Sequence, residues 1–453
     1  MGMRTILPVI PGYLLTLIQT LRARLRDANF QARQRVRPAD FTRACPLTFP
    51  VLMLFVLQKS VKSIQRHLHE FLDDLAAGPH FDPLTSGAVT HARAKLKASA
   101  FSELKQACVL PVIYGPQHPS QRWRGHRLVG VDSSLVRLPR NAELGPKFGW
   151  KEVTNQNGAP GTRFPEARLS VLYDVLNRVG WEARLEPSTL GEVALASQQL
   201  ARLQPGDVEL HDRGFTGYVY LALVRQRGVH FIARCSTGSF LAVQAMFRRN
   251  RANQSQGVWL FAPVDQRAEC RRLGLPGKLK VRLESLRLPH GELEVLATSL
   301  LDKVAYPTAE FLTVYHWRWG HETFYLMLKG RLELENFSGQ TVAAVEQDVQ
   351  AALLLANLES VLSEPAPAAL DRPRPTATQA RQVNRANSYH ASKDQVLDLL
   401  YREIPVTTVI HKLMKLFAGS PVAARPERRV PRCPSPSLHR SYHFQRRVKK
   451  AVF

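Results

Sequence analysis

The segment from Tyr315 to Lys329 constrains this chain most, because it places a carboxylate, two cations and a phenol on one face of a predicted helix. At about 100° per residue, Tyr315, Arg318, Glu322 and Lys329 fall within a sector about 60° wide. Apolar and aromatic side chains fall near the opposite pole. The pattern therefore predicts an amphipathic helix with an apolar back and an ionisable front.

Two interpretations of this ionisable face are open. Arg318 and Glu322 are four residues apart, so they can form the ion pair of an ordinary solvated helix. Lys329 lies two turns beyond Glu322, and two tryptophans are unfavourable on a purely solvated face. These features favour the second interpretation, in which a phosphate chain passes beside a carboxylate that binds a metal ion.

The charge of the whole chain indicates a polyanionic partner. Its 453 residues carry a formal net charge of +25, and the pI is near 10.3. Such a field favours nucleic acid over acidic small molecules. A basic protein of the membrane surface is the alternative, although no long basic amphipathic helix is paired with a lipid anchor. The hydrophobic content of 45% is ample for two or three domains.

The compartment is predicted from the cysteines and the opening residues. The five cysteines are widely scattered without a C-x2-C pair, which argues against a zinc module and a disulfide framework. The apolar stretch 6–18 contains two prolines and a glycine, and it lacks a small-residue cleavage site, so it does not resemble a signal peptide. We expect a cytoplasmic protein with no membrane segment.

Residues 1–125 are predicted to be helical, because apolar positions recur at three-and-four spacing. We also expect this region to bind DNA. The segment from Thr85 to Lys97 is short, begins with a capping residue and carries the basic residues Arg93, Lys95 and Lys97. It is either a recognition helix or a packing helix with a basic exposed edge.

From residue 126 the pattern changes to an α/β domain. Asp132 interrupts an apolar strand over 128–139, and Asp212 ends a short strand that glycines follow. The segments 168–173 and 180–185 are predicted as two antiparallel strands joined across Asn177-Arg178. A helix at 192–203, a helix from 218 and a strand at 229–234 follow in the chain. In such sheets ligands bind at the carboxyl ends of strands. Residues 236–305 are predicted as a β-rich insertion, with separate strands at 279–283 and 285–288. Helices follow at 308–329 and 342–362.

The remaining residues, 363–453, are predicted as a linker, a helical region and a basic tail. The linker covers 364–376, and helices are expected at 393–400 and 406–417. Beyond residue 421 cations greatly outnumber acids. This composition suits a polyanion-binding tail and a disordered end equally.

Three carboxylates stand out in this organisation: Asp132, Asp212 and Glu322. Each has a structural alternative, because Asp132 can cap a turn, Asp212 can cap a helix and Glu322 can pair with Arg318. Together they are hard oxygen ligands on rigid elements, which suit Mg²⁺ and an in-line phosphoryl displacement assisted by two ions. His211 and His321 adjoin two of the acids, but they are weaker candidates as ligands.

The spacing Y-x2-R-x3-E-x6-K resembles the signature of DDE transposases of bacterial insertion sequences, in the branch called family four. The resemblance covers roughly residues 125–360, through Gly130-Val-Asp132, His211-Asp-Arg-Gly-Phe215 and the predicted helix 308–329. It implies a ribonuclease-H-like fold in which Asp132, Asp212 and Glu322 bind two Mg²⁺ ions, for which Mn²⁺ can substitute. It also implies that Tyr315, Arg318 and Lys329 contact the DNA end.

The activity implied by this resemblance is cut-and-paste movement of an insertion sequence. A homodimer in a synaptic complex would bind the terminal inverted repeats and the target DNA. In some members an inserted tryptophan holds a flipped base during hairpin formation; Trp259 is a candidate, with a core tryptophan as the alternative. Two other functions remain open. They are a ribonuclease-H-like nuclease with another role and an inactive, transposase-derived DNA-binding protein.

Overall fold

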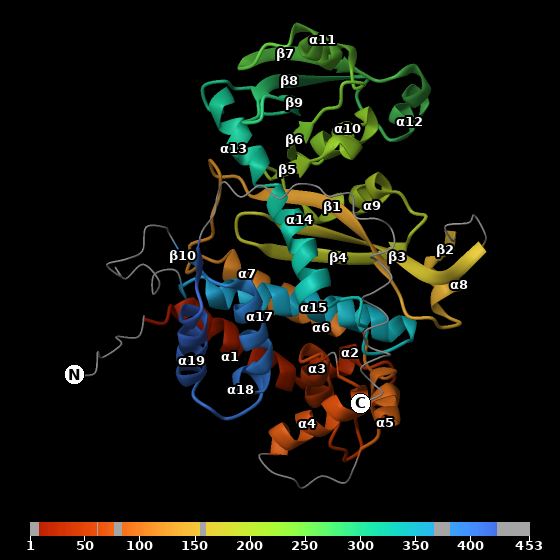
Figure 1. Cartoon of the computed structure of the whole chain (residues 1–453), viewed down its shortest axis with the longest axis vertical. Coiled ribbons are helices and arrows are strands. Elements are labelled where there is room, and N and C mark those ends of the chain that lie inside the picture. The colour runs from red at the N-terminus through yellow and green to blue at the C-terminus, as the bar shows by residue number, and fades with distance from the viewer. Residues whose placement is uncertain (1–8, 61, 77–83, 155–159, 367–380, 424–453) are drawn as a thin grey trace. The chain divides into compact units, whose positions relative to one another are not determined.

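The computed structural model of the chain describes residues 9–60, 62–76, 84–154, 160–366 and 381–423 (Figure 1). The chain divides into two units. The first unit comprises Met1–Ser120, Arg137–Glu166 and Met327–Phe453, and the second comprises Gln121–Val136 and Ala167–Leu326. Among the described residues, no helix combines the length and the apolar character that a membrane span requires.

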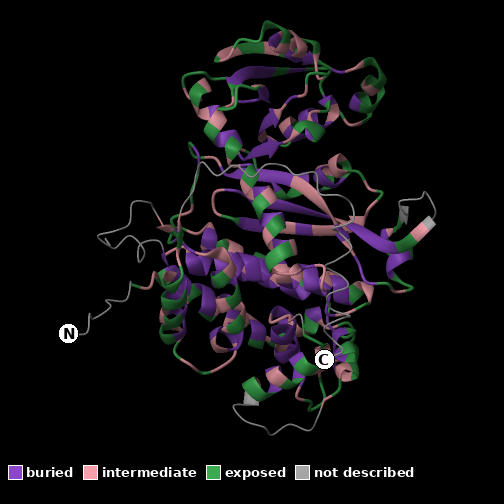
Figure 2. Cartoon of the chain, viewed as in Figure 1, coloured by how far each residue is buried: buried purple, intermediate pink, exposed green. Residues whose placement is uncertain are grey.

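Nine strands among the described residues form one sheet in the order β2-β3-β1-β5-β6-β9-β8-β7, with β4 paired to β3. Their bounds are β1 Leu128–Arg137, β2 Trp150–Thr154, β3 Pro160–Asp174, β4 Val179–Pro187, β5 Val208–His211, β6 His230–Arg234, β7 Gln254–Phe261, β8 Lys278–Arg287 and β9 Leu293–Thr298. Strand β5 and the first four residues of β1 are buried (Figure 2), as their valine and leucine content predicts.

The order of the five central strands fits the ribonuclease-H-like fold that the resemblance implied. Strand β3 pairs antiparallel with β4, and β1 pairs parallel with β5, which pairs parallel with β6. Val175 N donates to Leu128 O at 3.0 Å and Leu138 N donates to Pro165 O at 2.9 Å, so β1 and β3 run antiparallel. Three antiparallel strands are thus followed by two strands parallel to β1, and the predicted fold class is confirmed.

The insertion is less purely β than predicted. It contains β7, β8 and β9 together with helices α11 (Leu241–Arg249) and α12 (Arg267–Arg272). The two strands predicted at 279–283 and 285–288 are wrong, because they form the single strand β8. Glu284, which suggested the break, is fully buried and lies 2.7 Å from Arg282 Nε, so its charge is compensated within the sheet.

The helix predicted over 308–329 is also broken. A 3₁₀ turn at Thr308–Glu310 precedes α13 (Phe311–His316), α14 follows at Trp319–Leu326, and a π-helical turn covers Met327–Arg331. Between α13 and α14 the backbone bonds tighten, since Arg318 N donates to Tyr315 O and His321 N to Arg318 O. The ideal angular spacing assumed for this face therefore does not hold across the break.

Two further helices of the second unit connect consecutive central strands along the chain. Helix α9 (Glu192–Gln199) continues as a 3₁₀ turn at Leu200–Arg202, and α10 (Tyr218–Gln226) connects the turn after β5 to β6. Helices were predicted at both places, 192–203 and from 218. The 3₁₀ turn Arg213–Phe215 lies between β5 and α10.

The first unit is mainly helical. Its helices are α1 Gly12–Arg26, α2 Ala28–Gln34, α3 Phe49–Leu57, α4 Ile64–Ala76, α5 Ser86–Arg93, α6 Ser99–Leu104, a π-helical turn at Lys105–Val109, α7 Leu110–Ile113, α8 Leu144–Phe148, α15 Val342–Ser363, α17 Arg385–Asp394, α18 Val396–Leu400 and α19 Val406–Gly419. A short pair of strands, β10 (Arg381–Gln382) and β11 (Val422–Ala423), joins them.

Helix α15 is the centre of the first unit. It contacts α3, α6, α17 and α19, and most of its residues are buried on every face. A helix that is buried on almost every face requires such a complete shell of neighbours. Three of these neighbours, α3, α6 and α19, lie in segments predicted to be helical, whereas α17 was not predicted.

Arg93 is part of this core and is not on an exposed basic edge. Its guanidinium donates to Asp348 Oδ1 at 2.7 Å, to Ala344 O at 2.6 Å and to Gln347 Oε1 at 2.8 Å, and the side chain is only 4% exposed. Helix α5 ends at Arg93, before Lys95 and Lys97. The structure therefore favours the packing helix over the recognition helix.

We predict that Arg93→Met lowers the free energy of unfolding by about 3–5 kcal/mol, because it leaves Asp348 charged, buried and without its cation. Urea titration followed by circular dichroism measures this change. Lys95→Met, at an exposed position two residues away, is the matched control and should change stability by less than about 0.5 kcal/mol. Equal effects of the two substitutions would contradict a stabilising role for the ion pair.

Candidate active site

Asp132 and Asp212 occupy equivalent positions on neighbouring parallel strands. In the register of β1 and β5, Leu128 pairs with Val208 and Gly130 with Leu210. Continuing this register by two residues places Asp132 beside Asp212, immediately after the last residue of β5. Neighbouring strands lie about 4.8 Å apart. The sheet therefore brings together two of the three carboxylates singled out in the sequence.

Asp132 lies in a half-buried position that disfavours its negative charge. Its Oδ1 accepts a hydrogen bond from Ser133 N at 2.7 Å, so the local cap expected as the structural alternative is present. Burial is the main cause that raises the pKa of Asp132 to about 7, and the nearby charge of Asp212 raises it further. Arg318 opposes this shift. The positive charge near Asp132 is therefore too small to offset the effect of burial on its carboxylate.

Asp212 caps the 3₁₀ turn that follows β5. Its Oδ1 accepts from Gly214 N at 2.8 Å. A Cβ at position 214 would lie 3.2 Å from this oxygen, which explains locally why a glycine follows two residues after the aspartate. The turn thus fixes the side chain of Asp212 at the carboxyl end of the strand, where ligands bind in sheets of this kind.

Glu322 accepts a hydrogen bond from Arg318 Nη2 at 2.8 Å. The guanidinium of Arg318 is buried, whereas the side chain of Glu322 is 30% exposed. Arg318 also interacts electrostatically with Asp212 and Asp132. In the described ranges no three His, Cys, Asp or Glu residues are grouped closely enough to hold a metal ion. The structure therefore presents the pair Asp132 and Asp212, with Glu322 bonded to the adjacent cation.

Tyr315 is buried beneath these charged groups. Its side chain is 3% exposed, and its hydroxyl has no hydrogen-bond partner among the described residues. Burial raises the pKa of the phenol, and Glu294 and Asp212 raise it further while Arg318 lowers it. Tyr315 is therefore a neutral group close to the acidic pair, and it lies below the protein surface in this conformation.

Lys329 belongs to the first unit, where its Nζ lies 3.9 Å from Glu335 Oε1. Glu335 also accepts a hydrogen bond from Arg137 N at 3.2 Å. The pairing of Lys329 with Glu335 is long and partly exposed, so it stabilises the fold little.

His211 and His321 are core residues. His211 is fully buried, with Nε2 2.8 Å from Glu209 Oε2. His321 stacks between the rings of Tyr173 and Tyr325, at centroid distances of 5.4 and 5.0 Å. Burial lowers the pKa of His321 to about 3, so its imidazole is neutral. Both side chains have packing roles in this conformation.

A second charged network adjoins the site and was missed in the sequence. Arg234, at the end of β6, lies 2.8 Å from Glu294 Oε2 on β9 and 3.6 Å from Glu292 Oε1. Arg213 is 3.3 Å from Glu292. Glu294 is an acid within an apolar strand, which is the same signal that identified Asp132. The network links the insertion to the turn that holds Asp212.

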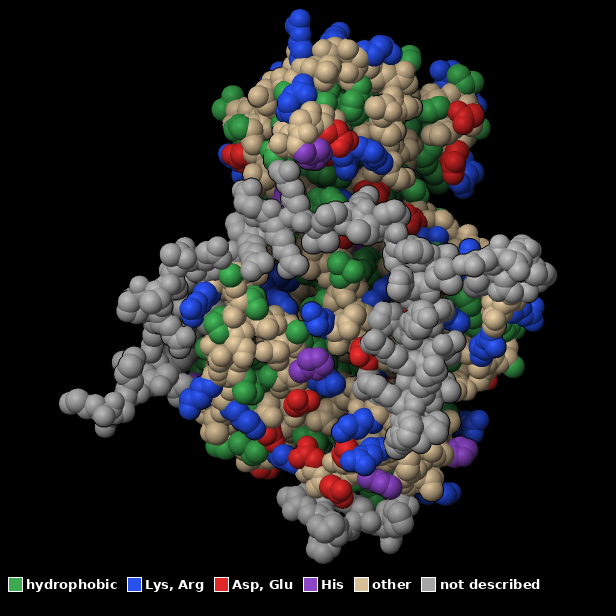
Figure 3. All heavy atoms as spheres, in the orientation of Figure 1, with side chains coloured by type: hydrophobic (Ala, Val, Ile, Leu, Met, Phe, Trp, Pro, Cys, Tyr) green, Lys and Arg blue, Asp and Glu red, His purple; other side chains and the backbone are tan. Residues whose placement is uncertain are grey.

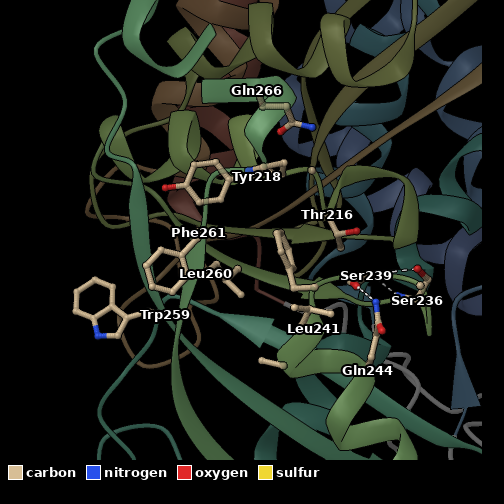
Figure 4. A pocket seen from close by; sticks show the side chains of 15 residues that line it. Thr216, Tyr218, Ser236, Ser239, Leu241, Gln244, Trp259, Leu260, Phe261 and Gln266 are labelled. Atoms are coloured by element: carbon tan, nitrogen blue, oxygen red, sulfur yellow. Dashed lines mark hydrogen bonds between the residues drawn. The ribbon is translucent and has the colours of Figure 1, made fainter. Parts of the chain in front are cut away.

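Trp259 lies on the surface of the insertion and not in its core. Its residue is 48% exposed on β7, and the Nζ atoms of Lys278 and Lys280 lie 4.9 and 6.0 Å from the ring centroid. A pocket of about 580 Å³ adjoins it, lined also by Leu241 and Phe261 (Figure 4). The core alternative for Trp259 is therefore wrong, because β7 is the edge strand of the sheet.

On the face drawn in Figure 3, Lys and Arg side chains are distributed with Asp and Glu between them, and they do not gather into a single stripe. A diffuse positive field of this kind attracts phosphate backbones without selecting a sequence.

Comparisons with known proteins give two findings. A family model described as the transposase DDE domain matches residues 123–358. A cryo-EM structure of the piggyBac transposase synaptic complex with hairpin DNA is similar at a TM-score of 0.40 and 10% sequence identity, covering 90% of this chain and 86% of that chain. No curated protein matches the chain.

We predict that the metal-free protein loses stability as the pH rises. Because the pKa of Asp132 is about 7 in the fold and 3.8 ordinarily, its protonation stabilises the fold fully below pH 3.8, and this contribution is lost as the pH rises to about 7. Between pH 5 and 8 in EDTA, Tm should fall less for Asp132→Asn than for the unmodified protein. The exposed Asp265→Asn is the control. Parallel Tm profiles for all three proteins would contradict the assignment.

Proposed function

The chain belongs to the transposase DDE domain family, and we propose that it moves a bacterial insertion sequence of the family-four branch by cutting and joining DNA strands. In this proposal it acts in the cytoplasm as a homodimer that holds two terminal inverted repeats and then captures target DNA. Residues 126–362 supply the chemistry. Residues 1–125 and 363–453 add contacts to DNA, although the basic segment 424–453 lies outside the described residues.

The pairing of Asp132 with Asp212 carries this proposal. Two carboxylates lie at matched positions of parallel strands, and burial disfavours the charge of one of them, so a bound divalent cation would compensate their negative charge. We propose that Asp132, Asp212 and Glu322 hold two Mg²⁺ ions, or Mn²⁺ in their place. When bound, such ions activate the attacking oxygen and stabilise the leaving one in an in-line displacement.

The ion pair between Arg318 and Glu322 suggests how DNA binding and ligand assembly are coupled. In the present conformation the carboxylate accepts from Arg318 at 2.8 Å. A DNA phosphate that binds the guanidinium competes for the same donor, because a phosphate offers bidentate acceptors. Glu322 is then released toward the aspartate pair. Tyr315 and Lys329 complete the proposed contacts to the DNA end.

Trp259 is proposed to hold an unpaired base if the reaction passes through a hairpin. The support is its half-exposed ring beside two lysines at the rim of an uncharged pocket. Aromatic rings with nearby cations stack on bases and neutralise the adjoining phosphates.

Two other functions would use the same acids differently. A ribonuclease-H-like nuclease of another role would cleave DNA without preferring terminal repeats. An inactive, transposase-derived protein would bind the repeats without cleaving them. Cleavage measured on DNA with and without the inverted repeats flanking the gene separates all three functions, because only the transposase both prefers the repeats and joins the cut ends to a target.

We predict that Asp132→Ala, Asp212→Ala or Glu322→Ala reduces Mg²⁺- or Mn²⁺-dependent cleavage by more than about 100-fold, since each removes a proposed ligand. Binding to terminal DNA should be retained, because no phosphate contact is removed. Gel assays of cleavage and binding test both statements. Asp265→Ala, an exposed carboxylate of the same unit, is the control. Near-normal cleavage by any one of the three would exclude that residue from the site.

Lys329 provides a separate test of DNA contact. Lys329→Ala should weaken binding of the terminal DNA and reduce the slope of log K against log salt by roughly one unit. The free energy of unfolding should change by less than about 0.5 kcal/mol if the ammonium of Lys329 serves DNA binding and not the fold. Lys415→Ala, another exposed lysine of the first unit, is the control. A lower Tm with unchanged DNA binding would assign Lys329 a structural role.

A further inference from the structure

A side chain contacts the facing backbone groups of β1 and β3 at the residue that carries the first carboxylate. The bond from Val175 N to Leu128 O sets an antiparallel register that places Val171 opposite Asp132. In a regular ladder with this register, the N–H of Val171 donates to the C=O of Asp132. The sequence of these strands gives no sign of a change at this point.

A tyrosine hydroxyl from α14 enters the ladder at this position. Val171 N donates to the hydroxyl of Tyr325 at 3.0 Å, and the hydroxyl lies 2.8 Å from Asp132 O and 3.2 Å from Leu169 O. A hydroxyl has one proton, so it donates to one carbonyl at a time, and the shorter distance favours Asp132. The phenol therefore bridges the two groups that would otherwise bond to each other.

Tyr325 also belongs to the helix that carries Glu322. The two residues are three positions apart on α14, so they are neighbours along the helix surface. The ring of Tyr325 is buried and stacks on His321 at 5.0 Å with an interplanar angle of 16°. The hydroxyl thus connects the backbone of one proposed ligand, Asp132, to the helix of another, Glu322.

A second close contact fixes the same helix against β1. A Cβ added at Gly130 would lie 3.0 Å from His321 Nδ1 and 3.3 Å from His321 Cβ. Glycine, which lacks a Cβ, allows this close approach without steric crowding. Helix α14 therefore contacts β1 at two residues, Gly130 and Asp132. These residues are two positions apart, so they face the same side of the sheet.

We infer that Tyr325 is a positioning residue whose hydroxyl sets the separation between Glu322 and the aspartate pair. Removing the hydroxyl lets Val171 and Asp132 bond directly, and the strands then close where α14 was held. Glu322 would lose its defined approach to Asp132 and Asp212, while the apolar packing of the ring would remain. This inference rests on the proposed function, because it concerns the metal ligands named there.

The test is Tyr325→Phe, which removes one oxygen atom. Mn²⁺ is titrated into the metal-free full-length protein, and binding is followed by the Mn²⁺ electron paramagnetic resonance signal and by the rise in Tm. We expect the apparent Kd for Mn²⁺ to increase by about 10–100-fold, as for other groups that orient metal ligands. The Mn²⁺ concentration required for half-maximal cleavage should increase in parallel.

Tyr220→Phe is the matched control, because it removes another buried tyrosine hydroxyl of the second unit, which donates to Glu209 Oε1 at 2.9 Å. It should lower Tm and leave the apparent Kd for Mn²⁺ unchanged. Gly130→Ala is a second variant that pushes His321 and α14 away from β1, and it should weaken Mn²⁺ binding as Tyr325→Phe does. It provides the decisive measurement if Tyr325→Phe does not fold.

The outcomes separate the inference from the function on which it rests. If the unmodified protein binds Mn²⁺ and the folded Tyr325→Phe variant binds it equally well, the inference is wrong and the proposed function stands. If the unmodified protein neither binds Mn²⁺ nor cleaves terminal DNA, the proposed function fails, and the positioning role fails with it. A loss of Tm alone in Tyr325→Phe would assign the hydroxyl a purely structural role and overturn the inference.

Discussion

The parallel register of β1 and β5 is the constraint on which the rest of the site depends. It forces two aspartates onto adjacent strands, where burial and mutual repulsion raise the pKa of Asp132 to about 7. Such an arrangement is unfavourable for folding alone, and it is stabilised only when a positive charge is added. The elements around Asp132 and Asp212 supply part of that charge and hold the two aspartates in place.

Positive charge can reach the two aspartates from two sources. The first is protein-based, since the buried guanidinium of Arg318 interacts with both aspartates and bonds to Glu322. The second is the proposed pair of metal ions. In the proposed function, Glu322 would turn from Arg318 toward the metal ions, whereas in the conformation described here it accepts a hydrogen bond from Arg318. Binding of a DNA phosphate to Arg318 gives a physical reason for that exchange.

Several errors in the predicted structure have one physical cause. Glu284 suggested a break in a strand, and Arg93 suggested an exposed basic edge, because charged residues are usually solvated. In the structure Glu284 is paired with Arg282 inside the sheet, and Arg93 is paired with Asp348, 255 residues along the chain. The predicted helix 308–329 failed for a related reason. Tertiary packing, and not intrinsic propensity, decides where its turns tighten.

The sequence by itself determined the α/β class, the basic character of the chain and the three candidate acids, because these depend on local spacing and composition. Only the tertiary structure decided which acids meet and what surrounds them. The register that pairs Asp132 with Asp212 and the entry of the Tyr325 hydroxyl between β1 and β3 join residues that are 80 and 193 positions apart. No local pattern records such pairings, since they arise from hydrogen bonds and packing that form only when the distant strands and α14 come together.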